Sequence, residues 1–369
     1  MEEINCIGCG VKIQTDHAEK VGYTPASSII KSEINTVYCR RCFRLKNYNE
    51  VIETELTSDD FFKILQGIAI YDALVVNIID IFDVAGTIVK GLIRHIGGND
   101  LIVVANKIDL LPRSVNHRRI KHWLNKEVRD LGIKPLDIAI VSSVRGDGID
   151  GLMNMINKYR KKRDVYIVGC TNVGKSTFIN HLIRQYAGIS ETLITTSRYP
   201  GTTLDIIDIP LNNDSSIIDT PGIINEHQLI HYVEKKYLKI IIPKKEIKPG
   251  VYQLKPKQTL YVGGLVRFDF VQGARTGFIT HFSNNLKIHR TKLDNADKLW
   301  ENHAGILLTP VIKDESELRK LKRHVFNVND DKIDIVISGL GFITVPKGKK
   351  EVHIYAPTSV GVFKRPSIF

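Results

Sequence analysis

The stretch Gly169-Cys170-Thr171-Asn172-Val173-Gly174-Lys175-Ser176 has the spacing GxxxxGKS. It directly follows the apolar run 165–168 and directly precedes segment 177–183, which has the pattern of a helix. This order of strand, glycine-rich loop and helix is the context that a phosphate-binding loop requires. The glycines let the backbone wrap around a phosphate, and the successive N–H groups and the helix N-terminus point at the anion. The alternative is an ordinary glycine-rich turn between a strand and a helix.

The last two residues of the motif favour the phosphate-binding interpretation. Lys175 would reach the β- and γ-phosphates, and the Ser176 hydroxyl would occupy one position on Mg²⁺. Cys170 contributes only its backbone in this interpretation. The residues that we expect around the phosphates are Gly169, Thr171, Asn172, Val173, Gly174, Lys175, Ser176 and Thr177.

A second motif, Asn106-Lys107-Ile108-Asp109, follows the hydrophobic segment Leu101–Ala105 and has the form NKxD. In this motif the carboxylate accepts hydrogen bonds from N1 and the 2-amino group of guanine. Adenine lacks that pair of donors, so a buried Asp109 would be left unpaired against it. We therefore expect Asn106, Lys107 and Asp109 to bind the nucleotide. The motif comes before the phosphate loop in the chain, whereas ordinary GTPases have it after that loop.

Two further motifs follow the phosphate loop. Pro200-Gly201-Thr202-Thr203 is a segment with adjacent hydroxyl groups, and Asp219-Thr220-Pro221-Gly222 has the form DxxG. Asp219 would hold Mg²⁺, through a water molecule, and the Gly222 N–H would sense the γ-phosphate. Either motif alone is compatible with a turn.

Four of the five cysteines form two CxxC pairs, Cys6/Cys9 and Cys39/Cys42, separated by 29 residues. Two such pairs are the usual way to place four thiolates tetrahedrally around Zn²⁺. Disulfides are the alternative, and we consider them less favourable in a chain without a signal peptide. Zinc sites of this kind usually hold together a module that is too small to have its own core.

Length and charge indicate several domains and a polyanionic partner. The chain has 369 residues, 43% of them hydrophobic, which suits two or three packed domains. No apolar run reaches the length that spans a bilayer, so we expect a cytoplasmic protein without a membrane partner. Residues 226–369 contain 25 Lys and Arg against 14 Asp and Glu, whereas the first 225 contain 27 against 26. This surplus suggests RNA as a partner, and the alternative is a solvated basic surface.

The middle of the chain alternates between helical and strand patterns. We predict a helix from Ser58 through Leu65, and a basic amphipathic helix at Arg118–Arg129. The predicted strands are Ala73–Ile79, Leu101–Ala105, Asp137–Val141, 165–168 and Ser216–Ile218. Such alternation predicts a doubly wound α/β sheet, with the ligand at the carboxyl ends of the strands.

The segment after about Lys244 has a mostly β pattern. Gln258–Phe270, Lys332–Val345 and Glu351–Tyr355 have strand patterns, and Ser316–His324 has the pattern of a short basic helix. We find no catalytic constellation in this segment. The best basic candidates for RNA contact are Lys347, Lys349, Lys350, Lys364 and Arg365.

The order NKID, SSV, GxxNVGKS, PGTT, DTPG resembles the circularly permuted GTPases. With the preceding CxxC pairs and the basic tail, the chain is similar to the YqeH-like ribosome-biogenesis GTPases over essentially its whole length. The most specific motifs lie between residues 106 and 222. The expected architecture is a zinc-binding module (1–52), a circularly permuted Ras-like P-loop GTPase domain (53–225) and a basic, mostly β domain (226–369).

The resemblance implies a GTP-hydrolysing switch that binds the small ribosomal subunit, or its precursor and rRNA, during assembly. It implies GTP or GDP, Mg²⁺ and Zn²⁺ as ligands, and we expect a monomer off the ribosome. Ser142, Ser143 and Val144 would belong to the loop over the guanine O6. Thr203 would be the Mg²⁺-binding switch threonine, with Thr202 as the second candidate. A helix after the DxxG motif would lead out through His227–Ile242 to the C-terminal domain and pass switch movement to it.

One departure from the Ras pattern concerns hydrolysis. Ile223 follows Gly222, where Ras-like proteins have a water-orienting glutamine, so intrinsic turnover should be slow. Asn172 matches the family's phosphate-loop asparagine that helps to bind K⁺, an ion that would supply positive charge near the γ-phosphate. The alternative role for Asn172 is to brace the loop. The groups that we expect to act in hydrolysis are Lys175, Thr203, Gly222 and Asn172.

The alternative function belongs to a different class. It is that of an NTP-driven enzyme that remodels or modifies RNA, with the zinc module taking part in the chemistry. It would need a further acid/base or helicase-type motif, and the sequence contains none that we recognise.

Overall fold

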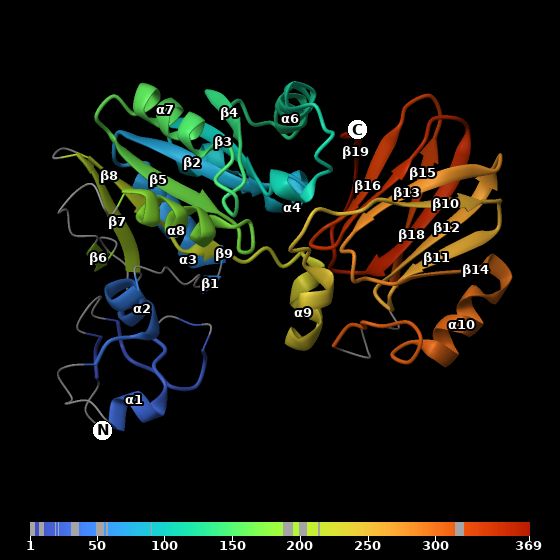
Figure 1. Ribbon diagram of the computed structural model, residues 1–369, viewed down its shortest axis with the longest axis horizontal. Helices are drawn as coiled ribbons and strands as arrows, with labels where there is room; N and C mark the ends of the chain where they lie inside the picture. Colours follow the sequence, from blue (N-terminus) through green and yellow to red (C-terminus); the bar gives the residue numbers. More distant parts are fainter. Residues whose placement is uncertain are drawn as a thin grey trace. The chain divides into compact units, whose positions relative to one another are not determined.

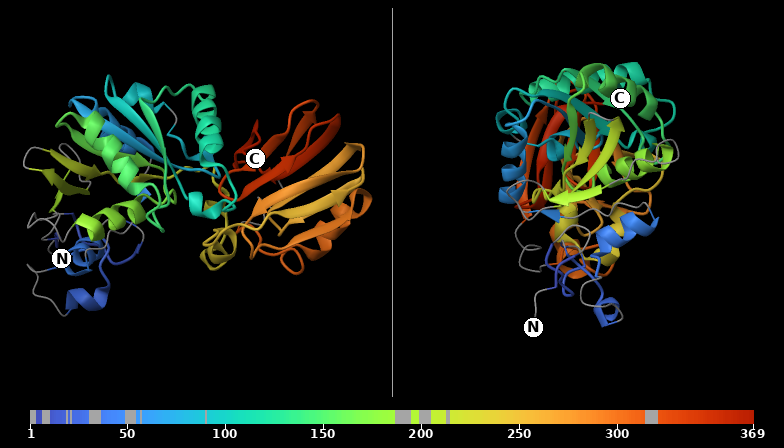
Figure 2. Two further views of the ribbon diagram at one scale, coloured as in Figure 1. Left: turned by 45° about the horizontal axis from the view of Figure 1, so that its top comes forward. Right: turned by 90° about the vertical axis from the view of Figure 1, so that its left-hand side faces the viewer.

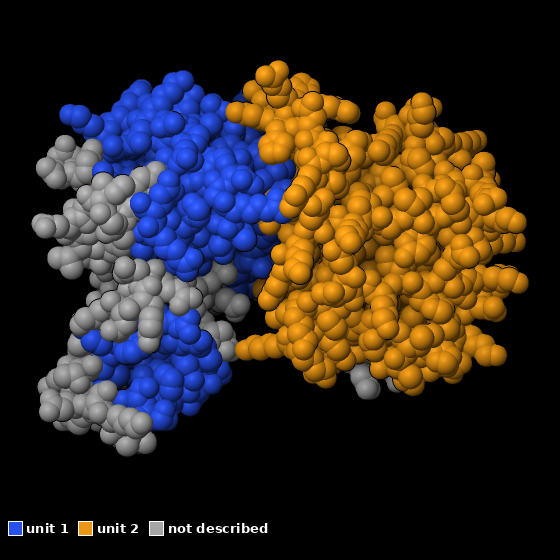
Figure 3. Space-filling view, viewed as in Figure 1, with its two compact units in different colours: residues 1–81, 87–108, 132–224 blue, residues 82–86, 109–131, 225–369 orange. Residues whose placement is uncertain are grey.

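The computed structural model describes residues 4–6, 11–18, 20, 22–30, 37–48, 55–56, 58–89, 91–186, 195–198, 205–212, 215–313 and 321–369 (Figure 1). The chain forms two compact units (Figure 3). Unit 1 comprises Met1–Ile81, Thr87–Ile108 and Gly132–Ile224, and unit 2 comprises Phe82–Gly86, Asp109–Leu131 and Asn225–Phe369. The three-part division at residues 52 and 225 stays a prediction. Within the described ranges, no helix is both long and apolar enough to cross a bilayer.

Unit 1 is built on a seven-stranded sheet with the order β4-β3-β2-β5-β8-β7-β6. The five strands from β4 to β8 in this order are parallel, and β7 and β6 are antiparallel additions. The strands are β2 (Ala73–Asp80), β3 (Asp100–Asn106), β4 (Asp137–Ile140), β5 (Asp164–Gly169), β6 (Thr195–Arg198), β7 (Asp205–Asn212) and β8 (Ser215–Asp219). The predicted parallel strands are therefore confirmed, and the mixed sheet confirms the α/β class.

Central strand β2 is buried from Ala73 to Ile79, because helices cover both faces of a parallel sheet. Figure 2 gives two further views of this twisted sheet with its flanking helices. Helices α7 and α8 contact β5. Among the described residues up to 186, the helices are α1 (Ala26–Ile30), α2 (Arg40–Tyr48), α3 (Ser58–Ile68), α4 (Val84–Thr87), α5 (Leu92–His95), η2 (Ile108–Leu110), α6 (His117–Asp130), α7 (Ile149–Arg160) and α8 (Lys175–Tyr186).

The order of motifs along the chain differs from the order of strands in space. Strand β3, which ends at the NKxD motif, precedes β5, which ends at the phosphate loop, and β2 lies between them in the sheet. Parallel strands bring their carboxyl ends to one edge, so both motifs lie at that edge despite their reversed order in the chain. The unit is thus a P-loop domain with a circularly permuted arrangement of motifs.

Unit 2 contains two five-stranded antiparallel sheets, with the orders β10-β13-β17-β16-β19 and β14-β11-β12-β18-β15. Phe268 and Phe270 of one sheet pack edge-on against Phe278 of the other, with ring centroids 4.9 and 5.0 Å apart. The strands are β10 (Gly250–Leu254), β11 (Gln258–Val262), β12 (Val266–Gly273), β13 (Thr276–Phe282), β14 (Ile288–Lys292), β15 (Leu321–Val328), β16 (Ile333–Ile337), β17 (Gly341–Val345), β18 (Lys350–Pro357) and β19 (Val362–Pro366). The mostly β character of the tail is confirmed.

Helix α6 belongs to unit 2, although it connects β3 to β4 of unit 1 along the chain. The Trp123 indole N–H donates to the Pro366 carbonyl at 3.0 Å, and the Arg365 guanidinium lies over the Trp123 ring. Segment Phe82–Gly86 also belongs to this unit, where Asp83 accepts hydrogen bonds from the Ser338 hydroxyl (2.6 Å) and the Gly339 N–H (3.0 Å).

One predicted helix is wrong within the described residues. Residues 321–324 of the predicted helix Ser316–His324 begin strand β15. They pair with β18, and the hydrogen bonds of that ladder override the local helix propensity. Residues 316–320 lie outside the described ranges. The DxxG motif ends in strand β9 (Gly222–Ile223), which pairs with β1 (Glu55–Leu56). The predicted helical connection through His227–Ile242 is present in part, as the two short helices η3 (Leu229–Tyr232) and α9 (Lys235–Ile241). Later in the chain come η4 (Leu293–Asn295) and α10 (Ala296–His303).

Two of the five predicted RNA-contacting cations are buried. The Lys350 ammonium donates to the carbonyls of Pro346, Lys347 (2.8 Å) and Gly348 (3.0 Å), and burial lowers its pKa. Arg365 is 4% exposed and lies over aromatic rings. Since both charges face inward, neither is placed for contact with a polyanion, whereas Lys347, Lys349 and Lys364 are exposed.

Candidate functional site

The phosphate-loop motif joins β5 to α8, which begins at Lys175. Gly174 has φ +88°, in the left-handed region, and a Cβ there would come within 2.4 Å of the Asn106 amide nitrogen. Only glycine fits at this position, because its neighbour is too close for any side chain. Asn172 also adopts a positive φ of 61°, which asparagine tolerates better than most residues. The local backbone therefore has the strand-loop-helix geometry that the sequence predicts.

Asn106 links the phosphate loop to the Ser142-Ser143 loop. Its amide N–H₂ donates to the Val173 carbonyl at 2.9 Å. Its side-chain oxygen accepts from both the N–H and the hydroxyl of Ser143, each at 3.0 Å. The asparagine is 2% exposed. Because all these partners are buried and mutually bonded, the first residue of the NKxD motif fixes the spacing between two loops that are 30 residues apart in sequence.

Lys107 is bonded to the phosphate loop at Asn172. Its ammonium donates to the Asn172 carbonyl and, at 2.8 Å, to Oδ2 of Asp80. Asp80 ends strand β2, next to β3 in the sheet. No sequence motif includes Asp80. The signal that could have pointed to it is its position at the end of an apolar strand next to β3, which leads into the NKxD motif.

Asp109 lies in the short helix η2 and is 9% exposed. The preceding residue, Ile108, donates its N–H to the Val141 carbonyl at 3.2 Å, at the end of β4. Ser142 and Ser143 follow Val141 and are buried, with the Ser142 hydroxyl accepting from the Arg145 N–H at 3.1 Å. Val144, unlike Ser142 and Ser143, is exposed (74%), so its side chain is open to contact with a ligand.

Lys175 and Asp219 form a buried ion pair between the phosphate loop and the DxxG motif. The ammonium lies 2.7 Å from Asp219 Oδ1 and also donates to the Thr220 carbonyl. The hydroxyl oxygens of Ser176 and Thr171 are buried and have no hydrogen-bond partner among the described residues. A carboxylate and an unsatisfied hydroxyl are oxygen ligands of the kind that Mg²⁺ takes, so these residues fit the metal.

The DxxG motif lies against the phosphate loop. The Thr171 N–H donates to the Ile223 carbonyl at 2.8 Å, and Cys170 forms a parallel β-bridge with Ile223. The Thr220 hydroxyl donates to the Ile167 carbonyl of β5 at 2.9 Å. Ile223 is 8% exposed, so its side chain packs inward. Thr202 and Thr203, with the rest of 199–204, lie outside the described residues.

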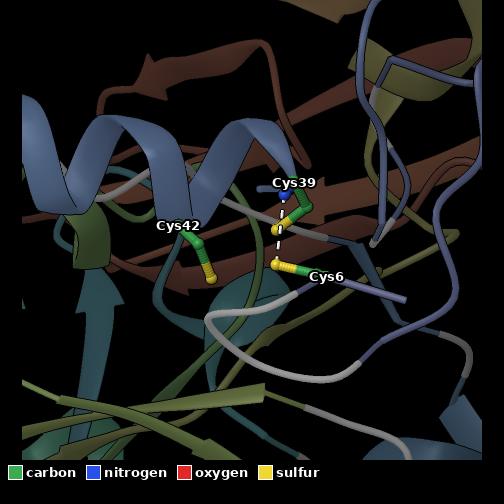
Figure 4. A group of neighbouring side chains, drawn as sticks. All are labelled: Cys6, Cys39 and Cys42. Carbon is green, nitrogen blue, oxygen red and sulfur yellow. Dashed lines mark hydrogen bonds between the residues drawn. The ribbon is translucent and has the colours of Figure 1, made fainter. Parts of the chain in front are cut away.

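Three cysteines form a candidate metal site. The Sγ atoms of Cys6, Cys39 and Cys42 all lie within 4.8 Å of one another, and all three side chains are buried (Figure 4). The Cys39 N–H donates to Cys6 Sγ at 3.1 Å. N–H donation to sulfur stabilises a thiolate, and three convergent sulfurs are a donor set that Zn²⁺ favours. Cys9, the fourth predicted ligand, lies outside the described residues.

Comparison with known proteins finds two family models that match different segments of the chain. Residues 164–252 match the family described as "50S ribosome-binding GTPase", and residues 275–368 match "YqeH-like, C-terminal". YqeH of Bacillus subtilis is 54% identical over 369 residues, which is 100% of both chains. The NO-associated protein 1 of Arabidopsis thaliana is 28% identical, over 98% of this chain and 76% of its own.

Among solved structures, GNP-bound YlqF from T. maritima aligns with 45% of this chain and 58% of its own, at 22% identity and a TM-score of 0.31. That score is too low to bear on the fold. The match to YqeH extends from end to end at more than half identity, and the motif geometry is that of a GTPase domain, which implies GTP or GDP and Mg²⁺ as ligands. The chain belongs to the YqeH family of GTPases.

Proposed function

We propose that this protein hydrolyses GTP as a switch in the assembly of the small ribosomal subunit, and that it binds rRNA or a pre-ribosomal particle. The observation that carries the nucleotide part is the bonding of Asn106 to both the phosphate loop and the Ser143 loop. That bonding holds the phosphate-binding and base-binding segments at one edge of the sheet. The family's resemblance to ribosome-biogenesis GTPases supports the assembly role.

Asp109 is the proposed guanine reader, with Ser142, Ser143 and Val144 at the guanine O6. The loop N–H groups and Lys175 bind the phosphates. The groups that hold Mg²⁺ are Ser176, Asp219 and Thr203, and the ion neutralises charge on the phosphate oxygens when bound. The remaining proposed nucleotide contacts are Lys107, Gly169, Thr171, Val173, Gly174, Thr177, Thr202 and Gly222.

Hydrolysis is proposed to be slow without an activator. Ile223 is aliphatic and buried, and its carbonyl already accepts the Thr171 N–H, so it has no group with which to orient water. Asn172 is the proposed K⁺ ligand. Its backbone is held by Lys107 and has a positive φ, which fixes where the residue projects from the loop. A monovalent cation there would meet the charge that develops on the γ-phosphate.

Charge supports an RNA partner for unit 2. This unit carries 31 Lys and Arg against 18 Asp and Glu, whereas the rest of the chain carries 21 against 22. The whole surplus therefore belongs to one unit, and a polyanion would be attracted to it selectively. Zn²⁺ held by Cys6, Cys9, Cys39 and Cys42 is the proposed support of the N-terminal module.

Nucleotide-dependent co-sedimentation with purified small ribosomal subunits tests the proposal. We expect the protein to pellet with the subunit more strongly in a non-hydrolysable GTP analogue than in GDP, and not with the large subunit. For an Asp109→Asn variant, the non-hydrolysable GTP analogue should no longer increase pelleting with the subunit. The corresponding non-hydrolysable XTP analogue should increase it instead. Equal pelleting in all nucleotide states would contradict a switch role.

A further inference from the structure

Unit 2 contains a pocket of about 400 Å³ between helix α6 and the sheet that includes β10 and β13. Its walls are mainly apolar: Val115 and Ile120 line it from the helix side, and Val251 and Ile279 from the two strands. A volume near 400 Å³ is at the lower end of the range of small-molecule sites. It suits one ring system with its substituents better than an extended chain.

A cluster of three aromatic rings adjoins this pocket. The His281 ring stacks on Phe342, with centroids 4.3 Å apart, and on Phe369, at 5.1 Å, and the centroids of Phe342 and Phe369 are 6.4 Å apart. Of the three, His281 and Phe369 line the pocket. Burial, followed by the nearby charges of Arg365 and Lys332, lowers the pKa of His281 to about 3, so its ring is neutral at pH 7. The two lining rings are therefore uncharged, and that of Phe369, the more exposed of the two, offers an aromatic face to a ligand with a flat π face.

Two cations accompany this apolar surface. Arg119, in the first turn of α6, and Lys332, just before β16, are both exposed and both line the pocket. The Lys332 ammonium donates to a main-chain oxygen of Phe369 at 3.0 Å, which holds it near the aromatic ring. The pocket thus combines an aromatic wall that can contact a planar ring with two cations that can bind negatively charged groups.

We infer that this pocket binds one unpaired nucleotide of a single-stranded RNA, with the base against Phe369 and the flanking phosphates on Arg119 and Lys332. The inference rests on the proposed function, in which unit 2 binds RNA. Proteins commonly recognise unpaired RNA by stacking its bases on aromatic rings beside a basic groove. An acidic peptide would satisfy the two cations, but its carboxylate side chains would leave the aromatic surface unstacked.

The test measures binding of the full-length protein to labelled octaribonucleotide (CA)4, which cannot pair with itself, and to an abasic oligomer of the same length and charge. We expect Phe369→Leu to weaken (CA)4 binding about tenfold and to leave abasic binding unchanged, since one stacked base is lost. Phe369→Tyr should bind as the wild type does. A thermal unfolding curve for each variant establishes that it is folded.

Arg119→Ala should weaken binding of both oligomers and reduce the slope of log affinity against log salt by about 0.7. Arg118→Ala is the matched control, because it removes the same charge from the same helix but does not line the pocket. It should change (CA)4 affinity by less than about twofold, well below the effect of losing a phosphate contact.

The outcomes separate the inference from the proposed function. If wild type binds (CA)4 and the abasic oligomer equally, or if Phe369→Leu has no effect, the nucleotide pocket is wrong while RNA binding by unit 2 stands. If wild type binds neither oligomer, the proposed RNA partner itself fails. Tight binding of octaglutamate that Phe369→Leu weakens would assign the pocket to an acidic protein and overturn the inference.

Discussion

The Lys175 ammonium lies 2.7 Å from Oδ1 of Asp219, and each side chain is 2% exposed. One partner is expected to bind phosphate and the other Mg²⁺, so nucleotide binding has to replace this ion pair with new contacts. A buried ion pair contributes little net stability, but the loss of one partner leaves an uncompensated buried charge. The nucleotide-free protein therefore depends on both residues together.

Asp219→Leu should lower the free energy of unfolding of the nucleotide-free protein by about 3 kcal/mol, because the Lys175 charge stays buried without its partner. The double variant Lys175→Met/Asp219→Leu should recover most of this loss, since it removes both charges. Urea denaturation without nucleotide measures both values. A single variant that is as stable as wild type would show that the pair is not buried in solution.

Replacing Cys39 and Cys42 with serine should release about one zinc ion per chain, because a tetrahedral thiolate site cannot hold the ion with two ligands missing. Metal analysis of the purified protein measures this. GTP affinity should change by less than about twofold if zinc supports a separate module. Cys170→Ser is the control, since Cys170 lies in the phosphate loop, and it should retain its zinc. Unchanged zinc in the double variant would rule out the thiolate site.

K⁺ should accelerate GTP hydrolysis about tenfold or more over equimolar Na⁺, because a cation near the γ-phosphate stabilises the transition state. Asn172→Ala should abolish most of this difference and leave GDP affinity nearly unchanged, since the contact acts in the transition state. Single-turnover rates in both salts measure the effect. Identical wild-type rates in K⁺ and Na⁺ would show that Asn172 supports the conformation of the loop and does not bind a cation.

Acid should destabilise unit 2 through His281. Its pKa is lowered in the folded protein from 6.5 to about 3, so between these values the unfolded state binds the extra proton. This contribution to stability is complete above pH 6.5 and falls by about 1.4 kcal/mol for each pH unit below it. His281→Phe keeps the ring stack and should lose less stability between pH 7 and pH 5 than wild type does. If urea denaturation gives the same pH dependence of the free energy of unfolding for His281→Phe and for wild type, His281 is not buried in solution.

The motifs that could be predicted from the sequence are local ones. The loop from Gly169 to Ser176 needs glycine where φ is positive and a lysine at the start of a helix, and both requirements fall within eight residues. Asn106 and Asp109 follow directly from a strand. The doubly wound sheet follows from apolar runs such as Ala73–Ile79, which only burial on both faces explains.

The features that could not be predicted depend on partners distant in sequence. Lys107 binds Asp80, and nothing local to either residue indicates the pair. Residues 321–324 have helical character, but their pairing with β18 makes them a strand. In both cases tertiary contacts outweigh the local preference. Lys350 is a different case: it appears as a surface cation in sequence, yet three carbonyls of its own turn bind its ammonium, and the conformation of that turn was not predicted.

Guanine selection by Asp109 is the claim on which the whole account depends. Isothermal titration of Asp109→Asn with GTP and XTP, beside wild type and the exposed control Asp147→Asn, tests it directly. We predict that GTP affinity falls at least about 100-fold in Asp109→Asn, because its amide cannot accept the two guanine hydrogen bonds. XTP should then bind better than GTP, while Asp147→Asn keeps the wild-type preference. GTP affinity unchanged in Asp109→Asn would contradict the assignment of this chain's guanine site.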